Sequence, residues 1–415
     1  MKTLAQIVAQ NRREASGGIA SWCTAHPETL QAILQAHHRS DDAILIEATC
    51  NQVNQYGGYT GMDPAAFRRF AEKLAGQANV DPSRIIFGGD HLGPNPWRDR
   101  QAAEAMAEAS RMVRAFAEAG FTKFHLDASM ACADDGRLDE SVIAERAAEL
   151  CAVADAHSGS IRPVYVIGTE VPIPGGEVRV LDELEVSSPE AVHRTYQLHR
   201  GAFAKRGLQD AFARVVGLVV QPGVDFGNSQ IFAFDKPRAR ALSQSVAQFP
   251  GVVFEAHSTD YQSERALSEL VQSHFAILKV GPELTFAYRE ALFAMEGIEA
   301  RLMVPTPSRL QETIESVMDD DPRHWREHVA RDENENTNKI FGLSDRIRYY
   351  WPNARIAEAV AQLRRNIDSS NVPIGLASQF SGQLAEDESG LLSERIIKQK
   401  VGSVVEKYRS ACRTS

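Results

Sequence analysis

Residues 84–128 read RIIFGGDHLGPNPWRDRQAAEAMAEASRMVRAFAEAGFTKFHLDA. This stretch begins and ends with short runs rich in β-branched and aromatic residues, at 84–90 and 121–128, which predict strands. Between them, apolar and small residues recur at spacings of three and four, which predicts an amphipathic helix over 100–120. The stretch therefore predicts a strand–helix–strand unit of a parallel sheet.

The same alternation of strand and helix patterns continues on both sides of this unit. Proline follows a good N-cap residue at Asp63-Pro64 and at Ser188-Pro189, which predicts two helix starts. Several strand candidates are apolar on both faces, as a fully covered parallel sheet requires. Eight such units over about 290 residues predict a closed (β/α)8 TIM barrel, with an open doubly wound sheet as the alternative. The eight predicted strands are 17–24, 43–49, 84–90, 121–128, 162–169, 213–221, 252–257 and 275–280.

The pattern changes after Met303. Residues 304–415 are richer in charge and contain no further strand of comparable strength. The sequence therefore predicts a TIM-barrel domain over 1–303 and a mostly helical C-terminal extension over 304–415. The polar run DENENTN at 332–338 is expected to be a solvated loop rather than a ligand cluster.

Composition and charge exclude several classes of protein. The chain has 415 residues, with 45 Lys plus Arg against 55 Asp plus Glu, so its net charge is 45 − 55 = −10. This acidic balance argues against nucleic acid or an anionic membrane as a partner, although a phosphorylated substrate needs only a few local donors. No apolar run approaches the length of about 18 residues that a membrane helix needs, and the N-terminus lacks a signal-peptide core. We therefore expect a cytoplasmic protein.

The five cysteines favour the same compartment. They are odd in number, scattered and without CxxC spacing, which is typical of reduced thiols. Three of them follow apolar runs near the predicted mouth of the barrel, and we expect buried or bystander thiols there rather than metal ligands. The cysteines are Cys23, Cys50, Cys132, Cys151 and Cys412.

Polar residues gather at the predicted carboxyl ends of the strands, where the working groups of such barrels lie. Strand ends converge on one axis, so two histidines and two carboxylates from four of these ends are expected to share a divalent ion. Zinc suits this set, and so do manganese, cobalt and nickel. The predicted metal ligands are His91, Glu170, Asp225 and His257. For each of them a structural role, such as pairing with a loop arginine, is the alternative.

Two further loops and one lysine suggest how a sugar would bind. The segment 51–62, NQVNQYGGYTGM, offers four amides and three glycines, which suits a polyhydroxylated ligand; a plain surface loop is the alternative. Lys279 ends the eighth predicted strand and could form a Schiff base, although an ordinary ion-paired lysine is the better prediction. The predicted sugar-binding residues are Asn51, Gln52, Asn54, Gln55, Gly58, Ser258, Thr259, Asp260 and Lys279.

Motifs for phosphate transfer are missing. The sequence contains neither GxxxxGK[ST] nor a kinase-type glycine loop, so we do not expect a kinase. Arg346 and Arg348 adjoin Tyr349-Tyr350-Trp351, and this basic and aromatic cluster could meet a phosphate at the barrel mouth or serve interdomain packing.

Long stretches of the chain resemble one family. NQVNQYGGYTGM, GGDHLGPNPW, GTEVPIPGG, QPGVDFG, FEAHSTDYQ, FAILKVGPELTFAYREALFA and LSDRIRYYWP are similar to the GatZ/KbaZ family. The resemblance implies a partner subunit of class II tagatose-1,6-bisphosphate aldolase, which feeds galactitol and N-acetylgalactosamine breakdown. Some relatives carry the older label tagatose-6-phosphate kinase, and others are described as C4 epimerases of ketoses or ketose phosphates.

The chain also resembles, more distantly, the catalytic class II aldolases. That resemblance implies that Asp90 moves a proton at the bond being broken, that His91 and His257 bind the metal, and that Glu170 is a second catalytic residue. Asp225 stands where those enzymes carry a third histidine, and Ser258-Thr259-Asp260 replaces their glycine-rich phosphate loop. An acidic group in that loop disfavours the same bisphosphate substrate.

Two functions follow from these residues. In the first, the chain is an accessory subunit of an aldolase. In the second, it is an independent metal-dependent C4 epimerase, in which Asp90 takes the C4 hydroxyl proton while the C3–C4 bond opens and closes again. The expected partners are a ketose or ketose phosphate, a class II aldolase subunit and further copies of the chain in a homo-oligomer.

Overall fold

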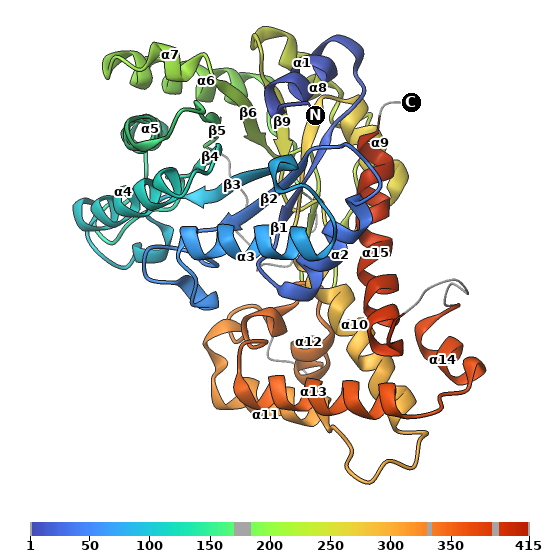
Figure 1. The fold of residues 1–415 in the computed structure, drawn as a ribbon. Helices are drawn as coiled ribbons and strands as arrows, with labels where there is room; N and C mark the ends of the chain where they lie inside the picture. The colour runs from blue at the N-terminus through green and yellow to red at the C-terminus, as the bar shows by residue number, and fades with distance from the viewer. Residues whose placement is uncertain (1, 170–183, 330–333, 384–389, 414–415) are drawn as a thin grey trace.

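The chain forms a closed eight-stranded parallel barrel, as the sequence predicts. It is seen here in a computed structural model that describes residues 2–169, 184–329, 334–383 and 390–413. The strands follow one another around the barrel in the order β1-β10-β9-β6-β5-β4-β3-β2, and the ring closes between β1 and β2 (Figure 1). They are β1 (Ile19–Cys23), β2 (Ile44–Thr49), β3 (Ile85–Leu92), β4 (Lys123–Leu126), β5 (Val164–Ile167), β6 (Val215–Val220), β9 (Val253–Ala256) and β10 (Phe275–Val280).

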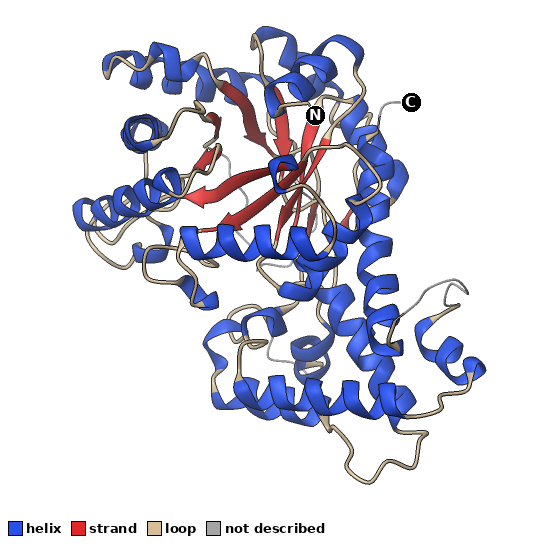
Figure 2. Cartoon of the chain, viewed as in Figure 1, coloured by secondary structure: helices blue, strands red, loops and turns tan. Residues whose placement is uncertain are grey.

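Helices surround the barrel on its outside, between consecutive strands (Figure 2). A short hairpin, β7 (Asp225–Phe226) with β8 (Ile231–Phe232), follows β6. The helices up to residue 299 are α1 (Leu4–Glu14), α2 (Pro27–His37), α3 (Pro64–Gln77), α4 (Ala102–Glu118), α5 (Glu140–His157), α6 (Pro189–Lys205), α7 (Gln209–Phe212), α8 (Arg240–Ser245), α9 (Glu264–Gln272) and α10 (Pro282–Glu299).

The local signals in the sequence act as expected. Helix α4 buries Met106, Ala109, Val113 and Phe116 along one face, which is the stripe that the spacing predicts. The Asp63 side chain accepts the Ala66 N–H at the start of α3, and the Ser188 hydroxyl does the same for Ala191 at the start of α6. Each cap satisfies a backbone donor that the first turn of a helix leaves unpaired.

The interior of the barrel changes character along its axis. Helix α1 covers the amino end, where its buried Leu4 and Val8 pack in one apolar cluster with Ile19, Leu45 and Val253. Inward-facing residues recur every second position along a strand. Two positions further along, Leu45 gives way to Glu47 and Val253 to Glu255. An apolar floor therefore lies below a charged middle layer, and the charged layer lies directly under the carboxyl ends of the strands.

The chain beyond residue 303 is helical in its described parts. Its helices are α11 (Leu310–Asp320), α12 (Glu335–Phe341), α13 (Ala354–Ser369), α14 (Ile374–Ser381) and α15 (Leu392–Cys412). The expected loop at 332–338 is wrong for 335–338, which form the first turn of α12. There Glu335 pairs with Arg326 at 2.6 Å.

Helix α15 returns to the barrel, although it belongs to the predicted extension. It runs beside α9 (Figure 1), and Tyr408 Oη donates to the carbonyl oxygen of Thr259 at 2.7 Å. The Gly18 N–H donates to the carbonyl oxygen of Cys412 at 2.9 Å. The division at residue 303 stays a prediction.

All five cysteines are free thiols, and three of them, Cys50, Cys132 and Cys151, are buried. Among the described helices, none combines the length and apolar character that crossing a bilayer would require.

Candidate active site

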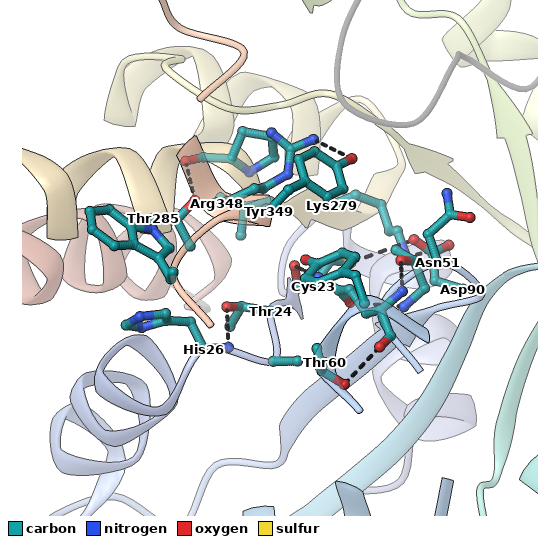
Figure 3. A pocket seen from close by; sticks show the side chains of 18 of the residues that line it. Cys23, Thr24, His26, Asn51, Thr60, Asp90, Lys279, Thr285, Arg348 and Tyr349 are labelled. Carbon is teal, nitrogen blue, oxygen red and sulfur yellow. Dashed lines mark hydrogen bonds and ion pairs between the residues drawn. The ribbon is translucent and has the colours of Figure 1, made fainter. Parts of the chain in front are cut away.

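A cavity of about 360 Å³ opens at the carboxyl end of the barrel. That volume is typical of a site for a small molecule. One wall comes from the loops after β1 and β2, including Thr24 and Thr60, and the opposite wall carries Arg348 and Tyr349 (Figure 3). The ends of β3, β9 and β10 add Asp90, His91, His257, Ser258 and Lys279. The cavity therefore lies where the strand ends were expected to place the chemistry.

Four buried charges form a ring beneath this cavity. Lys123 Nζ lies 2.6 Å from Glu47 Oε1 and 2.8 Å from Glu255 Oε2. Lys279 Nζ contacts the other oxygen of Glu47 and lies 3.9 Å from Glu255 Oε1. Two cations and two anions alternate, so each buried charge has an opposite neighbour on both sides, as burial of ions requires. Burial opposes the charge of Lys279, yet Asp90, Glu47 and Glu255 raise its pKa well above the ordinary value. A protonated amine is no nucleophile, so this arrangement disfavours the Schiff-base alternative.

Asp90 connects the ring to the cavity. Its Oδ1 accepts from Lys279 Nζ at 2.7 Å and lies 2.9 Å from His125 Nδ1. Its Oδ2 lies 3.7 Å from the Cys23 thiol and 3.8 Å from His91 Nε2. Burial favours the neutral acid, but His91, Lys279 and His125 outweigh it and hold the pKa of Asp90 well below its usual range. Asp90 is thus a carboxylate held on one oxygen and able to accept a proton on the other.

Three histidines from three strands meet beside Asp90. His91 lies near the end of β3, His125 lies in β4 and His257 follows β9, and each pair of ring centroids is 5.0 Å apart. Imidazoles that bind one tetrahedral ion through nitrogens at about 2.1 Å have ring centres about 5 Å apart. The spacing of the three rings therefore fits a shared ion.

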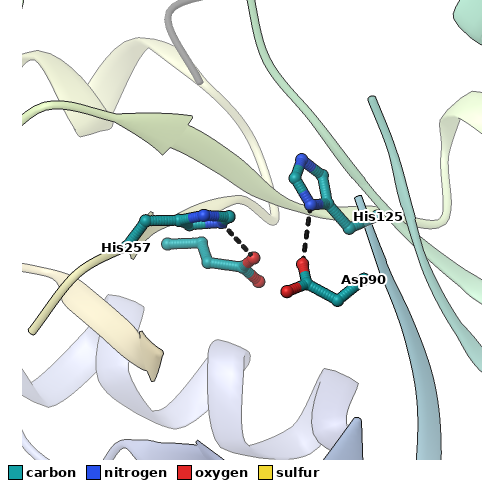
Figure 4. A group of neighbouring side chains, drawn as sticks. Asp90, His125 and His257 are labelled. Carbon is teal, nitrogen blue, oxygen red and sulfur yellow. Dashed lines mark hydrogen bonds and ion pairs between the residues drawn. The ribbon is translucent and has the colours of Figure 1, made fainter. Parts of the chain in front are cut away.

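Each of these imidazoles gives one nitrogen to a carboxylate. His91 Nδ1 lies 2.7 Å from Asp127 Oδ2, and His257 Nε2 lies 2.9 Å from Glu255 Oε1, which the ring holds in place. His125 Nδ1 meets Asp90 (Figure 4). An ionised carboxylate only accepts hydrogen bonds, so in His91 and His257 the contacting nitrogen carries the proton and the other nitrogen keeps its lone pair. His125 Nδ1 also lies 3.2 Å from the backbone N–H of His91, which can only donate, so two neighbours of opposite kind meet at this nitrogen. This arrangement, with a carboxylate behind the imidazole, is the usual support of metal-binding histidines.

The titration behaviour of the three side chains differs. Burial lowers the pKa of His257 to about 3, so its ring is neutral at ordinary pH. Burial also acts against protonation of His91, but Asp90 and Asp127 outweigh it and raise the pKa of His91 above the ordinary value. A proton therefore competes for the lone pair of His91 more than for that of His257.

The donor set fits a divalent metal. Ligand atoms of Asp90, His125, Glu255 and His257 lie within 4.8 Å of one another, and all four residues are buried (Figure 4). His125 Nε2 is a buried nitrogen with no hydrogen-bond partner among the described residues. Such an orphaned atom is costly unless a ligand satisfies it. The imidazole nitrogens of this group suit zinc, manganese, cobalt or nickel, which leaves the free oxygen of Asp90 for proton transfer.

The predicted metal ligands are only partly brought together. His91 and His257 adjoin as expected, and Asp90 lies between them and Lys279. Asp225 is buried in β7, where its Oδ1 accepts the N–H of Phe226. Neither Asp225 nor His91 belongs to the two groups of adjacent ligand atoms found in the described chain, although the ring of His91 adjoins those of His125 and His257. Glu170 lies outside the described residues, so its predicted catalytic and metal-binding roles stay predictions.

The predicted sugar-binding residues divide in the same way. Asn51, Gln52, Ser258, Asp260 and Lys279 line the cavity. The other four make structural contacts instead, because their side chains or backbone complete turns and helix packing. Asn54 accepts the Tyr56 and Gly58 N–H groups, Gln55 donates to Glu108, Gly58 has φ +54° against the Gln52 carbonyl, and Thr259 donates to the Lys279 carbonyl oxygen.

Sequence reasoning missed His125, Asp127 and Glu255. Each of the three lies two positions from another polar residue along the chain. Lys123, His125 and Asp127 alternate in this way in and directly after β4, and Glu255 and His257 do so at the end of β9. That period-two run of polar residues inside an apolar strand was the available signal. The prediction considered polar residues at the ends of strands, and so it did not include the alternating polar residues within them.

The chain beyond the barrel supplies the opposite wall. Arg348 and Tyr349 in the 3-10 turn η6 (Arg346–Tyr349), together with Trp351 and Pro352, line the cavity. Asp345, just before this turn, accepts from Thr285 Oγ1 of α10 at 2.5 Å. The basic and aromatic cluster therefore reaches the barrel mouth, one of the two roles expected for it.

Comparisons with known proteins agree with this architecture. A crystal structure of a probable tagatose 6 phosphate kinase from Sinorhizobium meliloti 1021 superposes with a TM-score of 0.86 at 45% identity, over 95% of this chain and 100% of that one. A fructose-bisphosphate aldolase from Campylobacter jejuni matches at 12% identity and a TM-score of 0.43, over 87% of this chain and 90% of that one. An aldolase from Escherichia coli K12 gives 10% and 0.42, over 89% and 99%. The last two likenesses are too remote to carry an argument.

A family model covers nearly the whole chain. It matches residues 4–413 and describes D-tagatose-1,6-bisphosphate aldolase subunits of the GatZ/KbaZ-like type. The match takes in the strand ends, the histidine cluster and the wall that contains Arg348. The chain therefore belongs to the GatZ/KbaZ-like family of D-tagatose-1,6-bisphosphate aldolase subunits.

Proposed function

We propose that this chain performs metal-assisted retro-aldol chemistry on a ketose or ketose phosphate in the cavity at the barrel mouth. The observation that supports it is the cluster of His91, His125 and His257 around the carboxylate of Asp90. A scaffold has no physical need for three buried imidazoles, each backed by its own carboxylate. In the cell, this chemistry would serve the breakdown of galactitol or N-acetylgalactosamine.

The proton chemistry falls to Asp90. A divalent ion bound by the histidines would supply Lewis acidity toward the ketose carbonyl. Asp90 accepts the proton of the C4 hydroxyl as the C3–C4 bond breaks, and the electron pair of that bond moves onto the carbonyl-bearing fragment. The C4 carbon becomes an aldehyde. Lys279 holds Asp90 ionised before the step, and Asp90 returns the same proton when the bond forms again.

The fate of the aldehyde separates two functions. Its release is aldolase chemistry, whereas rotation and closure on the other face is epimerisation at C4. One observation favours the second outcome for the chain alone: Arg348, Tyr349 and Trp351 of the same chain form the wall opposite the strand loops. A cavity with both walls from one chain can hold both fragments without a partner subunit.

The test uses the purified full chain without a partner. It is incubated with Mn, Co, Ni or Zn and with tagatose and fructose, each free, as the 6-phosphate and as the 1,6-bisphosphate. Interconversion without triose release establishes the epimerase, and triose release establishes an aldolase. Silence with every metal contradicts the proposal and favours an accessory role beside a catalytic partner.

Asp90→Asn is the matched variant for this test. It keeps the size of the side chain and the contact with the histidines but removes the base. Turnover is expected to fall by about 10³-fold or more, while metal bound per chain, measured by atomic emission, stays close to that of the parent protein. Unchanged turnover would contradict the assignment of Asp90 as the base.

A further inference from the structure

Two places on the cavity wall have the chemistry to hold an anionic group of a substrate. One is the amino end of α10, directly after β10, where loops after the last strands of such barrels commonly bind phosphate. The other is Arg348, on the wall from the C-terminal segment. The structure treats these two places differently.

The amino end of α10 is already filled by the protein itself. Asp260 Oδ1 accepts the N–H of Gly281 at 3.0 Å and that of Glu283 at 2.8 Å. Burial and the neighbouring Glu283 raise the pKa of Asp260 to about 7, but its oxygen occupies both donors in either protonation state. A phosphate has no free N–H groups there and would meet an acidic side chain.

Arg348, by contrast, has donors to spare. Nη1 donates to the carbonyl oxygens of Ser344 and Asp345, and Nη2 donates to Tyr349 Oη at 3.1 Å. Nε and the second hydrogen of Nη2 have no acceptor within the described chain. These two groups form the edge of a guanidinium that binds a carboxylate or phosphate through two parallel hydrogen bonds.

The charge of Arg348 is also uncompensated by an ion pair. No carboxylate of the described residues lies within 4.0 Å of its nitrogens, unlike Lys279 on the facing wall. Burial lowers the pKa of Arg348, and Tyr349, Tyr59 and, to a smaller extent, Asp345 raise it above the ordinary value. The oxygens of Asp345 themselves are directed at Thr285 and Arg289. A partly buried cation of this kind is stabilised by an anion from outside the chain.

Tyr349 completes the arrangement. The guanidinium carbons of Arg346 and Arg348 lie 4.6 and 4.5 Å from the centre of its ring. On the other side, Tyr59 from the loop after β2 packs against it with ring centroids 4.9 Å apart. These contacts fix the direction of Arg348 and bring a phenolic hydroxyl beside its free edge.

We infer that the cavity takes a ketose with a single oxyanion group, phosphate or carboxylate, at the end away from the reacting bond, and that Arg348 and Tyr349 bind this group. A second anionic group finds no site in the described chain, because Asp260 occupies the helix end that would hold it. The sugar part of this inference rests on the proposed function, whereas the anion part does not.

The experiment measures binding without added metal. Isothermal titration calorimetry of the full chain uses inorganic phosphate, a ketose, its 6-phosphate, its 1,6-bisphosphate and the corresponding ketouronate. Comparison of the 6-phosphate with the ketouronate shows whether the site prefers phosphate or carboxylate. The variants are Arg348→Met and Arg348→Lys. Arg265→Met is the control, since this arginine is exposed at 87% on α9 and does not line the cavity. Circular dichroism and thermal unfolding of each variant show whether it is folded.

In the parent protein, one of the two sugars with a single anionic group binds about 10- to 100-fold more tightly than the free ketose, as a charge-assisted hydrogen-bonded contact allows. Arg348→Met abolishes that preference and leaves the affinity for the free ketose within about twofold. Arg348→Lys retains part of it, and Arg265→Met all of it. Three results overturn the inference: equal affinity of the parent for free and anionic sugars, an equal loss for both in Arg348→Met, or a bisphosphate that binds more than about tenfold tighter than the 6-phosphate.

Binding of this kind without turnover in any metal contradicts the proposed function alone. Turnover of free ketoses with no preference for an anionic group contradicts this inference alone. The two failures are therefore distinguishable.

Discussion

The two walls of the cavity treat charge in opposite ways. Beneath the wall built by the strand ends, each buried cation meets carboxylates: Lys123 and Lys279 alternate with Glu47 and Glu255 in a closed ring. On the wall built by the C-terminal segment, Arg348 makes no ion pair within the described chain and instead lies against the ring of Tyr349. Ion-paired side chains such as Lys279 are held in fixed positions, which suits a role in catalysis. A cation without an ion pair, such as Arg348, attracts an anionic ligand, which suits a role in substrate binding.

The first prediction concerns the ring of buried charges and removes one of its two cations. Lys123→Met leaves Glu47 and Glu255 beside an apolar side chain in the barrel interior. Loss of one partner of a buried ion pair costs about 3–5 kcal/mol, and we expect the free energy of unfolding in urea to fall by that amount. Lys205→Met is the matched control, because the Lys205–Glu145 pair is exposed at 72% and 54% and should change stability by less than about 0.5 kcal/mol. A similar small effect for both variants would show that the ring does not stabilise the barrel.

The second prediction concerns the support behind one histidine. Asp127→Asn removes the carboxylate that receives the Nδ1–H of His91 and leaves the ring free to turn. Metal affinity, measured by competition with a chelator, is expected to fall about 10- to 100-fold. Asp135→Asn is a control of the same chemistry away from the histidines, since Asp135 pairs with Arg146. An unchanged affinity in Asp127→Asn would mean that His91 is not a ligand.

The third prediction concerns the pH dependence of binding, which should differ between the histidine cluster and Arg348. A histidine must be neutral to bind a metal, and the pKa of His91, a predicted ligand, is raised above its ordinary value in the folded protein. The protonated form predominates below that pKa, so metal affinity should fall by up to about tenfold for each unit of pH below it and level off above it. Arg348, a guanidinium whose pKa is raised above its ordinary value, stays charged over this range, and binding of sulfate should not follow the same curve. Both are measured by titration between pH 5 and pH 8; parallel curves would remove the distinction.

The smallest expected effect tests the predicted boundary at residue 303. Tyr408 of α15 donates to the Thr259 carbonyl, next to the cavity wall formed by Ser258 and Asp260. Tyr408→Phe deletes this hydrogen bond and is expected to cost about 1 kcal/mol of stability with a single unfolding transition. A separate transition for the C-terminal helices would instead support an independent extension.

Much of the architecture was open to prediction because it follows from local pattern. Strand periodicity located all eight barrel strands, and the N-caps at Asp63 and Ser188 marked two helix starts. Since parallel strands end on one side of a barrel, Asp90, His91 and His257 were expected near one another, and they are. Their roles in catalysis and metal binding remain predictions.

The folded chain, and not the sequence pattern, determines which polar side chains lie close together. His125, Asp127 and Glu255 looked like strand interior, while Asn54, Gln55 and Thr259 looked like ligand-binding residues. The direction of a side chain depends on register and on the packing of neighbouring strands, and one residue of shift reverses it. The same holds for Arg348, which lies 69 positions beyond Lys279 in the sequence yet lines the same cavity, since 348 − 279 = 69. Sequence alone determined the barrel and the family, because both rest on local order; the folded chain determined the site, because it joins residues that are distant in sequence.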